Sequence, residues 1–425
     1  MTSEILIMNK EAVALAADSA ATVQLYGTDQ KKIFTSSNKI FQLSKNAPVA
    51  IMVYQNSSLM GIPWETIVKM YREHLKEQTY PALKDYVDNF FQFVSGFINE
   101  KMQVDFFAPI IRGLFQEIAQ GIQVKANEII GTEGGIDEER VKMILKSTIN
   151  NYFNLFEKCE LFPAFLNDEE GIFGIYRSVW EPLIINEFQS LTLDEEDSKH
   201  LLLIATFWLT RNINRDDYSG VVITGFGEQE LFPSAHSFLF QRVLLGKLVF
   251  QEESKLWIDY SNQSCVKPFA QSEMTHAFMT GITTNFENQI MQSFANIIEN
   301  KCNKIIQKNE EIKSNTQPQM QEFIEGIKLE SINDWQNQIG YLKHAMSIAP
   351  AIKIVEYLPK DELALMAETL VNLNSFKKRI SLDAETIGGP IDVAVISKKD
   401  GLIWIRRKHY FDPSLNSQYK GQCSK

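Results

Sequence analysis

Residues 2–22 of the chain read TSEILIMNKEAVALAADSAAT. Two short apolar runs, Glu4–Met8 and Ala12–Ala17, are separated by the polar triplet Asn9-Lys10-Glu11. Short apolar runs on either side of a polar turn are typical of two antiparallel strands joined as a hairpin. The sequence therefore predicts that the chain begins with a β-hairpin.

Further strand patterns lie outside this hairpin. Val49–Tyr54 is a continuous apolar run, short enough for a strand that is buried on both faces. Near the C-terminus, the turn Lys398–Gly401 separates two apolar runs and predicts a second hairpin. The other strands that we expect are Lys39–Leu43, Gly220–Gly225, Leu256–Tyr260, Pro390–Ser397 and Leu402–Arg406, with a strand or loop around Arg242–Phe250.

Helical periodicity fills the intervals between the strands. From Ile62 onward the apolar spacing becomes helical, and Pro63-Trp64-Glu65 is a typical helix start. Strands that can form two antiparallel sheets, with helices outside them, predict a layered α+β fold. The further helices that we expect are Leu83–Phe97, Asp105–Ile130, Glu138–Phe156, Ser198–Leu209, Met274–Lys308, Met320–Glu325, Asn333–Tyr341 and Lys360–Leu373.

The composition argues against several classes of function. The formal net charge of the 425 residues is -11, so we expect no large basic surface and no nucleic-acid partner. The longest apolar run, Leu201–Leu209, is shorter than the ~20 residues of a membrane span, so no membrane partner is expected. Four widely spaced cysteines and the absence of metal and nucleotide motifs predict a cytoplasmic protein with no metal and no cofactor.

The opening hairpin resembles the start of a proteasome β subunit. Mature members of that family begin with Thr and reach an Ala-Ala-Asp-Ser-type motif at the distance that separates Thr2 from Ala16-Ala17-Asp18-Ser19 here. Lys39–Leu43 resembles the family's Lys-bearing strand, and Ile387-Gly388-Gly389 resembles its closing Ser-Gly-Gly. The resemblance is to a bacterial proteasome-like member of the N-terminal-nucleophile (Ntn) hydrolases. It implies a four-layer αββα sandwich with large α-helical insertions.

The resemblance also implies a division of the chain. Residues 1–70 would form the N-terminal part of the Ntn domain, and residues 71–214 a helical insertion. Residues 215–280 would supply the middle strands and a helix, and residues 281–357 an additional helical segment. The closing helix and terminal strands would lie in 358–411, followed by a flexible tail at 412–425.

For the chemistry, the resemblance implies a threonine nucleophile. After removal of Met1, Thr2 would attack a carbonyl, and its own α-amino group would act as the base, usually through water. Asp18 and Lys39 resemble the Asp and Lys that lie beside the family's nucleophile. The positive charge of the lysine would lower the proton affinity of the hydroxyl and the amine, and Asp18 would orient it. Lys31 and Lys32 compete with Lys39 for this role, and Lys32 is the second choice.

Backbone N–H groups near Gln55 are expected to hold the oxyanion. Here the chain departs from the family, because Tyr54-Gln55-Asn56 stand in place of a Gly-rich turn and imply a strained backbone. The family's Asp and Ser before the closing Gly-Gly are also unmatched. Either Glu385 or Thr386 substitutes for them, or that support is lost.

Two classes of function follow. The first is a proteasome-like threonine hydrolase that cleaves peptide or amide bonds of a peptide or protein substrate and assembles as a homo-oligomer. The alternative is a catalytically inactive structural or regulatory assembly subunit of the same fold, with the helical insertion as its partner surface. A small-molecule amidase of the same class is a third option. A mature chain that begins at Thr2 would favour an enzyme.

Overall fold

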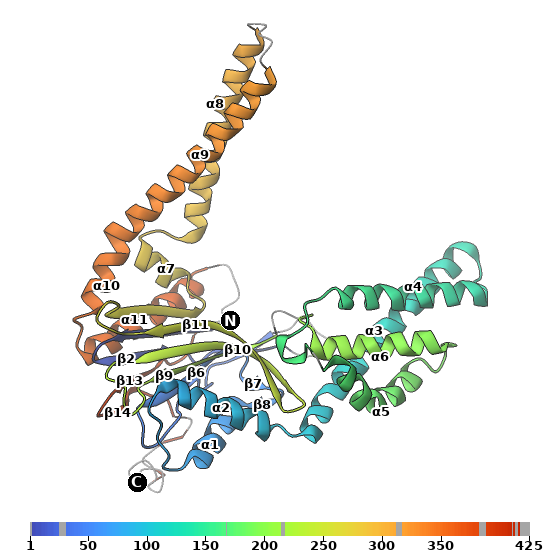
Figure 1. Ribbon diagram of the computed structural model, residues 1–425, viewed down its shortest axis with the longest axis horizontal. Helices are drawn as coiled ribbons and strands as arrows, with labels where there is room; N and C mark the ends of the chain where they lie inside the picture. The colour runs from blue at the N-terminus through green and yellow to red at the C-terminus, as the bar shows by residue number, and fades with distance from the viewer. Residues whose placement is uncertain are drawn as a thin grey trace.

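The computed structural model describes residues 2–24, 31–166, 168–213, 217–311, 317–381, 388–409, 411–412 and 415–416. Two five-stranded antiparallel sheets and many helices confirm the predicted α+β class. Helices lie on the outer faces of the stacked sheets, and two helical projections extend away from them (Figure 1).

The first sheet is built around the opening hairpin. Its strands are β1 (Ser3–Asn9), β2 (Ala12–Ala17), β12 (Ser264–Ala270), β13 (Asp392–Ser397) and β14 (Gly401–Arg406). They lie in the order β12-β1-β2-β13-β14. Leu6 of β1 lies opposite Leu15 of β2, and Ala14 of β2 lies opposite Val395 of β13. The beginning and the end of the described chain therefore meet in one sheet. The sequence analysis did not identify β12.

The second sheet has the order β11-β10-β9-β6-β5. Its strands are β5 (Ile40–Gln42), β6 (Val49–Gln55), β9 (Ser219–Gly225), β10 (Ser234–Leu244) and β11 (Lys247–Trp257). The Arg242–Phe250 region, left open between strand and loop, belongs to the hairpin of β10 and β11. Leu245 and Gly246 both have positive φ at its turn. Two short pairs complete the strands: β3 (Ala21–Gln24) with β4 (Lys31–Phe34), and β7 (Ser58–Leu59) with β8 (Ile62–Pro63).

The alternation of side chains along β1 explains how the layers pack. Leu6 and Met8 share a buried apolar cluster with Met52 of the second sheet. Ile5 and Ile7 face the other way and share a cluster with helix α11 (Lys360–Arg379). Because both faces of the first sheet are covered, its central strands β1, β2 and β13 are buried along their whole length.

Helices α1 (Trp64–Leu75) and α2 (Leu83–Phe97) cover the outer face of the second sheet. The ring centroid of Trp64 lies 5.7 Å from that of Phe240 on β10, and Phe91 of α2 lies 5.0 Å from the same ring. The expected boundary between residues 70 and 71 falls inside α1. The helical layer on this sheet therefore includes the first residues that the sequence analysis assigned to the insertion.

The first projection consists of α3 (Glu100–Glu133), α4 (Glu138–Glu157), α5 (Glu169–Glu187) and α6 (Glu195–Thr210) (Figure 1). Helix α3 begins before the predicted Asp105. The reason is that the Asn99 side chain caps its N-terminus by accepting a hydrogen bond from the Met102 backbone N–H. Between α4 and α5, the chain forms a short 3-10 turn, η1 (Pro163–Phe165).

The second projection is a hairpin of α8 (Thr284–Glu311) and α9 (Gln317–Lys343), which extends on the side of the sheets where α11 packs (Figure 1). It follows α7 (Glu273–Thr280) and continues into η2 (His344–Ile348) and α10 (Ala349–Val355). An ion pair of 2.5 Å between Glu287 and Lys343 joins its two helices. Among the helices of the described ranges, none has both the length and the apolar character required to cross a membrane.

Gly220 of β9 provides a test of the packing of the second sheet. A Cβ at this position would lie 2.0 Å from Cζ of Tyr54, whose hydroxyl donates a hydrogen bond of 2.7 Å to Glu253. We expect Gly220→Ala to lower the free energy of unfolding by about 1–3 kcal/mol in urea titrations, because the overlap forces the ring to move. Gly113→Ala in α3, where a Cβ meets no atom within 4 Å, is the control and should not destabilise. Equal stability of the two variants would contradict the packing.

Candidate active site

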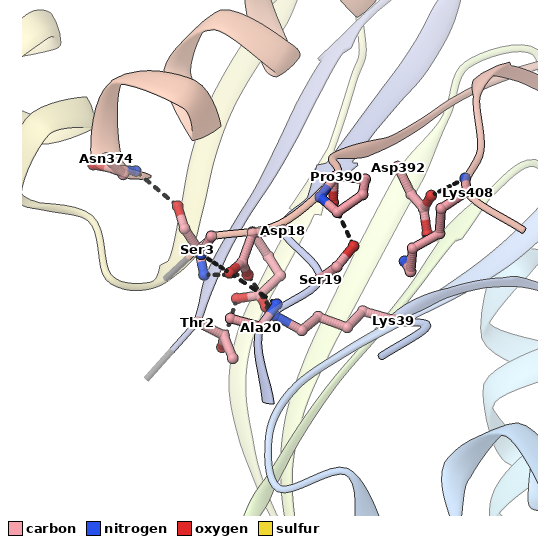
Figure 2. Close-up of polar contacts among 12 residues, drawn as sticks. Thr2, Ser3, Asp18, Ser19, Ala20, Lys39, Asn374, Pro390, Asp392 and Lys408 are labelled. Atoms are coloured by element: carbon pink, nitrogen blue, oxygen red, sulfur yellow. Dashed lines mark hydrogen bonds and ion pairs between the residues drawn. The ribbon is translucent and has the colours of Figure 1, made fainter. Parts of the chain in front are cut away.

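Three segments bring the predicted residues Thr2, Asp18 and Lys39 together (Figure 2). Thr2 directly precedes β1, and Asp18 directly follows β2. The hairpin places these two ends side by side, and the Asp18 N–H donates to the Ser3 carbonyl at 3.1 Å. Lys39 directly precedes β5 in the second sheet, and its Nζ lies 2.5 Å from Oδ1 of Asp18. The site therefore lies where the two sheets meet.

The position of Lys39 distinguishes it from Lys32. The Lys39 side chain is 6% exposed, and its ammonium contacts two carboxylates. Lys32 is exposed, and its Nζ lies 5.3 Å from the centroid of the Phe34 ring. The side chain of Lys31, the third candidate, lies outside the described set. Of the two described lysines, the structure brings Lys39 to Asp18.

Asp18 is held by an unusually complete set of donors. Oδ1 accepts the Ser3 N–H at 3.0 Å as well as the lysine ammonium, and Oδ2 accepts the N–H groups of Ala20 at 3.2 Å and Gly388 at 3.0 Å. Gly388 belongs to the closing Gly-Gly of the sequence motif. Gly389 beside it has φ 79°, and a Cβ there would lie 2.8 Å from Cβ of Thr35. The motif thus contributes a backbone donor in a tightly packed, left-handed turn.

Glu4 is a member of the site that the sequence analysis did not select. It stands two residues after Thr2 on β1, so the two side chains share one face of the strand. The Thr2 hydroxyl donates to Oε2 of Glu4 at 3.1 Å, and Lys39 Nζ lies 3.0 Å from Oε1. The Glu4 side chain is fully buried. One sequence signal could have identified Glu4. It is a carboxylate within a largely apolar strand, two residues from the candidate nucleophile.

The surroundings of Glu4 change its acidity. Burial disfavours the charged carboxylate and raises the pKa of Glu4 from 4.5 to about 7. The Lys39 ammonium opposes this rise, whereas the negative charge of Asp18 adds to it. Glu4 is therefore a carboxyl group that exchanges its proton near neutral pH.

A cavity of about 600 Å³ opens beside this cluster. Thr2 and Lys39 line it together with Gln55, so the cavity is next to the candidate nucleophile. Apolar groups on the wall suit part of a substrate, and amides and hydroxyls can bind its polar atoms. Other lining residues include Asn38, Asn56, Phe106, Asp217, Tyr218, Phe240 and Gln241.

Gln55 has φ 68°, in the left-handed region that favours glycine. At this position the resemblance implied a strained backbone in place of a Gly-rich turn, and the left-handed φ agrees with that expectation. A left-handed non-glycine residue costs roughly 1–2 kcal/mol and persists where the surrounding structure imposes it. Such strain is concentrated at functional sites, and Gln55 lies on the same cavity as Thr2.

Asn374 of α11 is a second residue that the sequence analysis missed. Its amide nitrogen donates to Oγ of Ser3 at 2.9 Å (Figure 2). It also donates to the Gln271 carbonyl at 3.2 Å and to Oγ1 of Thr275 at 3.2 Å. The Gln271 N–H in turn donates to the Thr2 carbonyl at 3.0 Å. Asn374 therefore ties the start of β1 to α7 and fixes the backbone of the candidate nucleophile.

Other polar residues near the site have structural partners. Asp392 accepts from both the backbone N–H and the ammonium of Lys408, and Ser19 donates to the Pro390 carbonyl (Figure 2). Arg406, near Lys408 in the sequence, is likewise paired, with Glu368. Glu385 and Thr386, the candidates for additional support, lie outside the described residues. Within the described ranges, no group of three or more potential ligands is arranged to hold a metal ion.

No protein-family model matches the chain, and no curated protein matches it. The function is therefore inferred from the residues and geometry of the site.

Proposed function

We propose that the chain is a threonine hydrolase of the proteasome-like Ntn class, which cleaves peptide or amide bonds with Thr2 as its nucleophile once Met1 is removed. One observation carries the proposal. Thr2, Lys39 and Gln55, whose backbone is left-handed, all line one cavity. These are the nucleophile, the charge beside it and the oxyanion position that the class requires.

The fold supports the same proposal. Two antiparallel sheets are stacked on each other, with α11 on one outer face and α1 and α2 on the other. This is the arrangement expected of a four-layer αββα Ntn sandwich. In that sandwich the nucleophile occupies the start of the first strand, which is the position of Thr2 before β1.

The proposed reaction proceeds through an acyl-enzyme. The Thr2 hydroxyl attacks the substrate carbonyl, and backbone N–H groups near Gln55 stabilise the oxyanion. Lys39 keeps positive charge beside the reacting hydroxyl, and Asp18 holds the lysine through an ion pair of 2.5 Å. In this class, the free α-amino group of the nucleophile serves as the base. Water then hydrolyses the ester and releases the acid product.

Intact mass and N-terminal sequencing of protein from its native host, combined with a Thr2→Ala variant, test the proposal. We expect a mature chain that begins at Thr2 and hydrolyses peptide amides. Thr2→Ala should lose roughly 10³-fold or more of this activity, because the attacking oxygen is gone. Thr2→Ser, which keeps a hydroxyl, is the matched control and should remain active. Full activity of Thr2→Ala would exclude Thr2 as the nucleophile.

The second candidate function is the inactive assembly subunit. It is favoured by the large apolar side chains exposed on the two helical projections, since such surfaces often bind partners. Examples on the projections are Met143, Ile185, Phe286, Phe323 and Met346. A native chain that keeps Met1 and hydrolyses no peptide would support this function over the hydrolase.

A further inference from the structure

We propose that Glu4 accepts the proton of the Thr2 hydroxyl when that hydroxyl attacks a carbonyl. The assignment rests on the proposed hydrolase function and adds a catalytic residue to it. In the Ntn class this proton transfer is the task of the α-amino group, and Glu4 was not among the residues that the sequence resemblance implied.

The geometry meets the first requirement of a general base, which is hydrogen-bond reach of the proton that it takes. Oγ1 of Thr2 already donates to Oε2 of Glu4 at 3.1 Å. Thr2 lines the cavity, whereas Glu4 does not and is fully buried. The carboxylate therefore lies behind the nucleophile and can take its proton without occupying the space of the substrate.

The charges of the cluster favour proton uptake. Glu4 and Asp18 share Lys39, and within the described part of the chain no second cationic side chain forms an ion pair with either carboxylate. With all three groups ionised, the cluster holds one unbalanced negative charge in a buried position. A proton that arrives from Thr2 neutralises the buried carboxylate, and the negative charge moves to the substrate oxyanion, which backbone N–H groups can stabilise.

Hydrogen bonding selects Glu4 over Asp18 as the acceptor. Asp18 receives three backbone N–H groups in addition to the lysine, and each of them stabilises its charged form. Within the described residues, Glu4 receives the Thr2 hydroxyl on Oε2 and the Lys39 ion pair on Oε1, a smaller set of donors than that of Asp18. Two neighbouring carboxyl groups in such different environments are suited to different roles. The pKa of about 7 at Glu4 is consistent with a base that works at neutral pH.

The chemical steps balance. As the Oγ1–C bond forms, the carbonyl π electrons move to oxygen and the Thr2 proton moves to Oε2 of Glu4. Collapse of the tetrahedral intermediate breaks the C–N bond, and the proton passes to the leaving nitrogen, which departs as an amine. Water then attacks the Thr2 ester and gives a proton to Glu4. The C–Oγ1 bond breaks, and Thr2 recovers that proton. One amide and one water become one acid and one amine.

Within the described residues, two charged groups act on Glu4: Lys39 before β5, which pairs with it, and Asp18 after β2. On β6, Tyr54 donates to Glu253, and burial raises the pKa of this phenol. Farther out, Lys408 pairs with Asp392. The α-amino group of a mature Thr2 has an ordinary pKa of roughly 7.7–8.0. Because this range is close to that of Glu4, substitution as well as a pH profile is required to separate the two bases.

The test measures acylation of the full chain that begins at Thr2, with p-nitrophenyl acetate as the probe. Release of p-nitrophenolate gives the rate, intact mass counts the acetyl groups, and tandem mass spectrometry of the N-terminal peptide locates them. We expect Glu4→Gln to slow acylation by about 10²–10⁴-fold and to remove the rise in rate near pH 7. Glu4→Asp keeps a titratable carboxylate, so it should retain the rise at a lower rate. Glu287→Gln changes a Glu–Lys pair in the α8–α9 hairpin and should match the wild type.

Each outcome decides between the two bases. If Glu4→Gln is acylated at a rate within about threefold of the wild-type rate and with the same pH profile, the proposal is overturned. The α-amino group would then be the base. If Glu4→Gln behaves in this way but Thr2→Ala is not acylated, Thr2 remains the nucleophile and only the role of Glu4 is refuted. Acylation of Thr2→Ala at the wild-type rate would instead refute the proposed function itself. Circular dichroism shows whether each variant folds. If Glu4→Gln does not fold, Glu4→Asp decides the question. The proposal is overturned if the acylation rate of Glu4→Asp no longer rises near pH 7.

Discussion

Replacing Lys39 with Met is expected to lower the free energy of unfolding by about 3–5 kcal/mol at pH 8. The variant keeps the volume of the side chain but leaves the carboxylates of Glu4 and Asp18 buried without their cation. Removing one partner of a buried ion pair is costly because the remaining charge has neither water nor a counter-ion. Urea denaturation at pH 8 measures the loss.

Two further variants isolate the cause. Lys32→Met removes an exposed ammonium, and its stability should stay within about 0.5 kcal/mol of the wild type. The double variant Lys39→Met with Glu4→Gln should recover part of the loss, since only one buried carboxylate then remains without a cation. A cost for Lys39→Met no larger than that for Lys32→Met would show that Lys39 is not the counter-ion of the cluster.

Stability should also fall as the pH rises, because of Glu4. Its pKa is about 7 in the folded chain against an ordinary 4.5, so between these values the folded state binds a proton that the unfolded state has released. The stabilisation is fully present below about pH 4.5 and is lost as the pH rises through 7. With roughly 1.4 kcal/mol for each unit of pKa shift, we expect a loss of about 3 kcal/mol across this window.

Glu4→Gln provides the reference for this measurement. Glutamine cannot titrate, so the difference in unfolding free energy between the wild type and the variant isolates Glu4. Other groups, such as His236, whose pKa is lowered by burial, contribute equally to both proteins. We expect the difference to shift in favour of the variant from pH 5 to pH 8 in parallel urea titrations. A constant difference would mean that Glu4 stays ionised in the folded chain throughout.

The stability effects expected for Lys39 and Glu4 have the same physical origin as the proposed catalytic role of Glu4. A buried carboxylate with an incomplete set of partners destabilises the folded chain at alkaline pH, and the same deficit makes it a proton acceptor beside Thr2. Functional sites commonly retain such unfavourable groups at the expense of stability. The left-handed Gln55 on the same cavity is a second example.

Much of the fold was predictable from local patterns. The opening hairpin, the strand Val49–Tyr54 and the closing hairpin are confirmed, because continuous apolar runs and polar turns are properties of neighbouring residues. The edge strand β12 was not predictable. Its sequence Ser264–Ala270 mixes polar residues with a proline, and it is held as a strand by pairing with β1. Pairing of this kind joins residues more than 250 positions apart, which no local pattern records.

The candidate site also has features that the sequence predicts and features that depend on tertiary structure. The sequence by itself determined that Thr2 and Asp18 lie at neighbouring ends of one hairpin, because spacing and turn chemistry are local. Only the tertiary structure decided that Lys39 rather than Lys32 meets Asp18, and that Glu4 belongs to the cluster. The choice depends on which side chains the second sheet buries against the first. Burial and the balance of charge are collective properties of segments that are distant in sequence, so they exist only once the two sheets have packed.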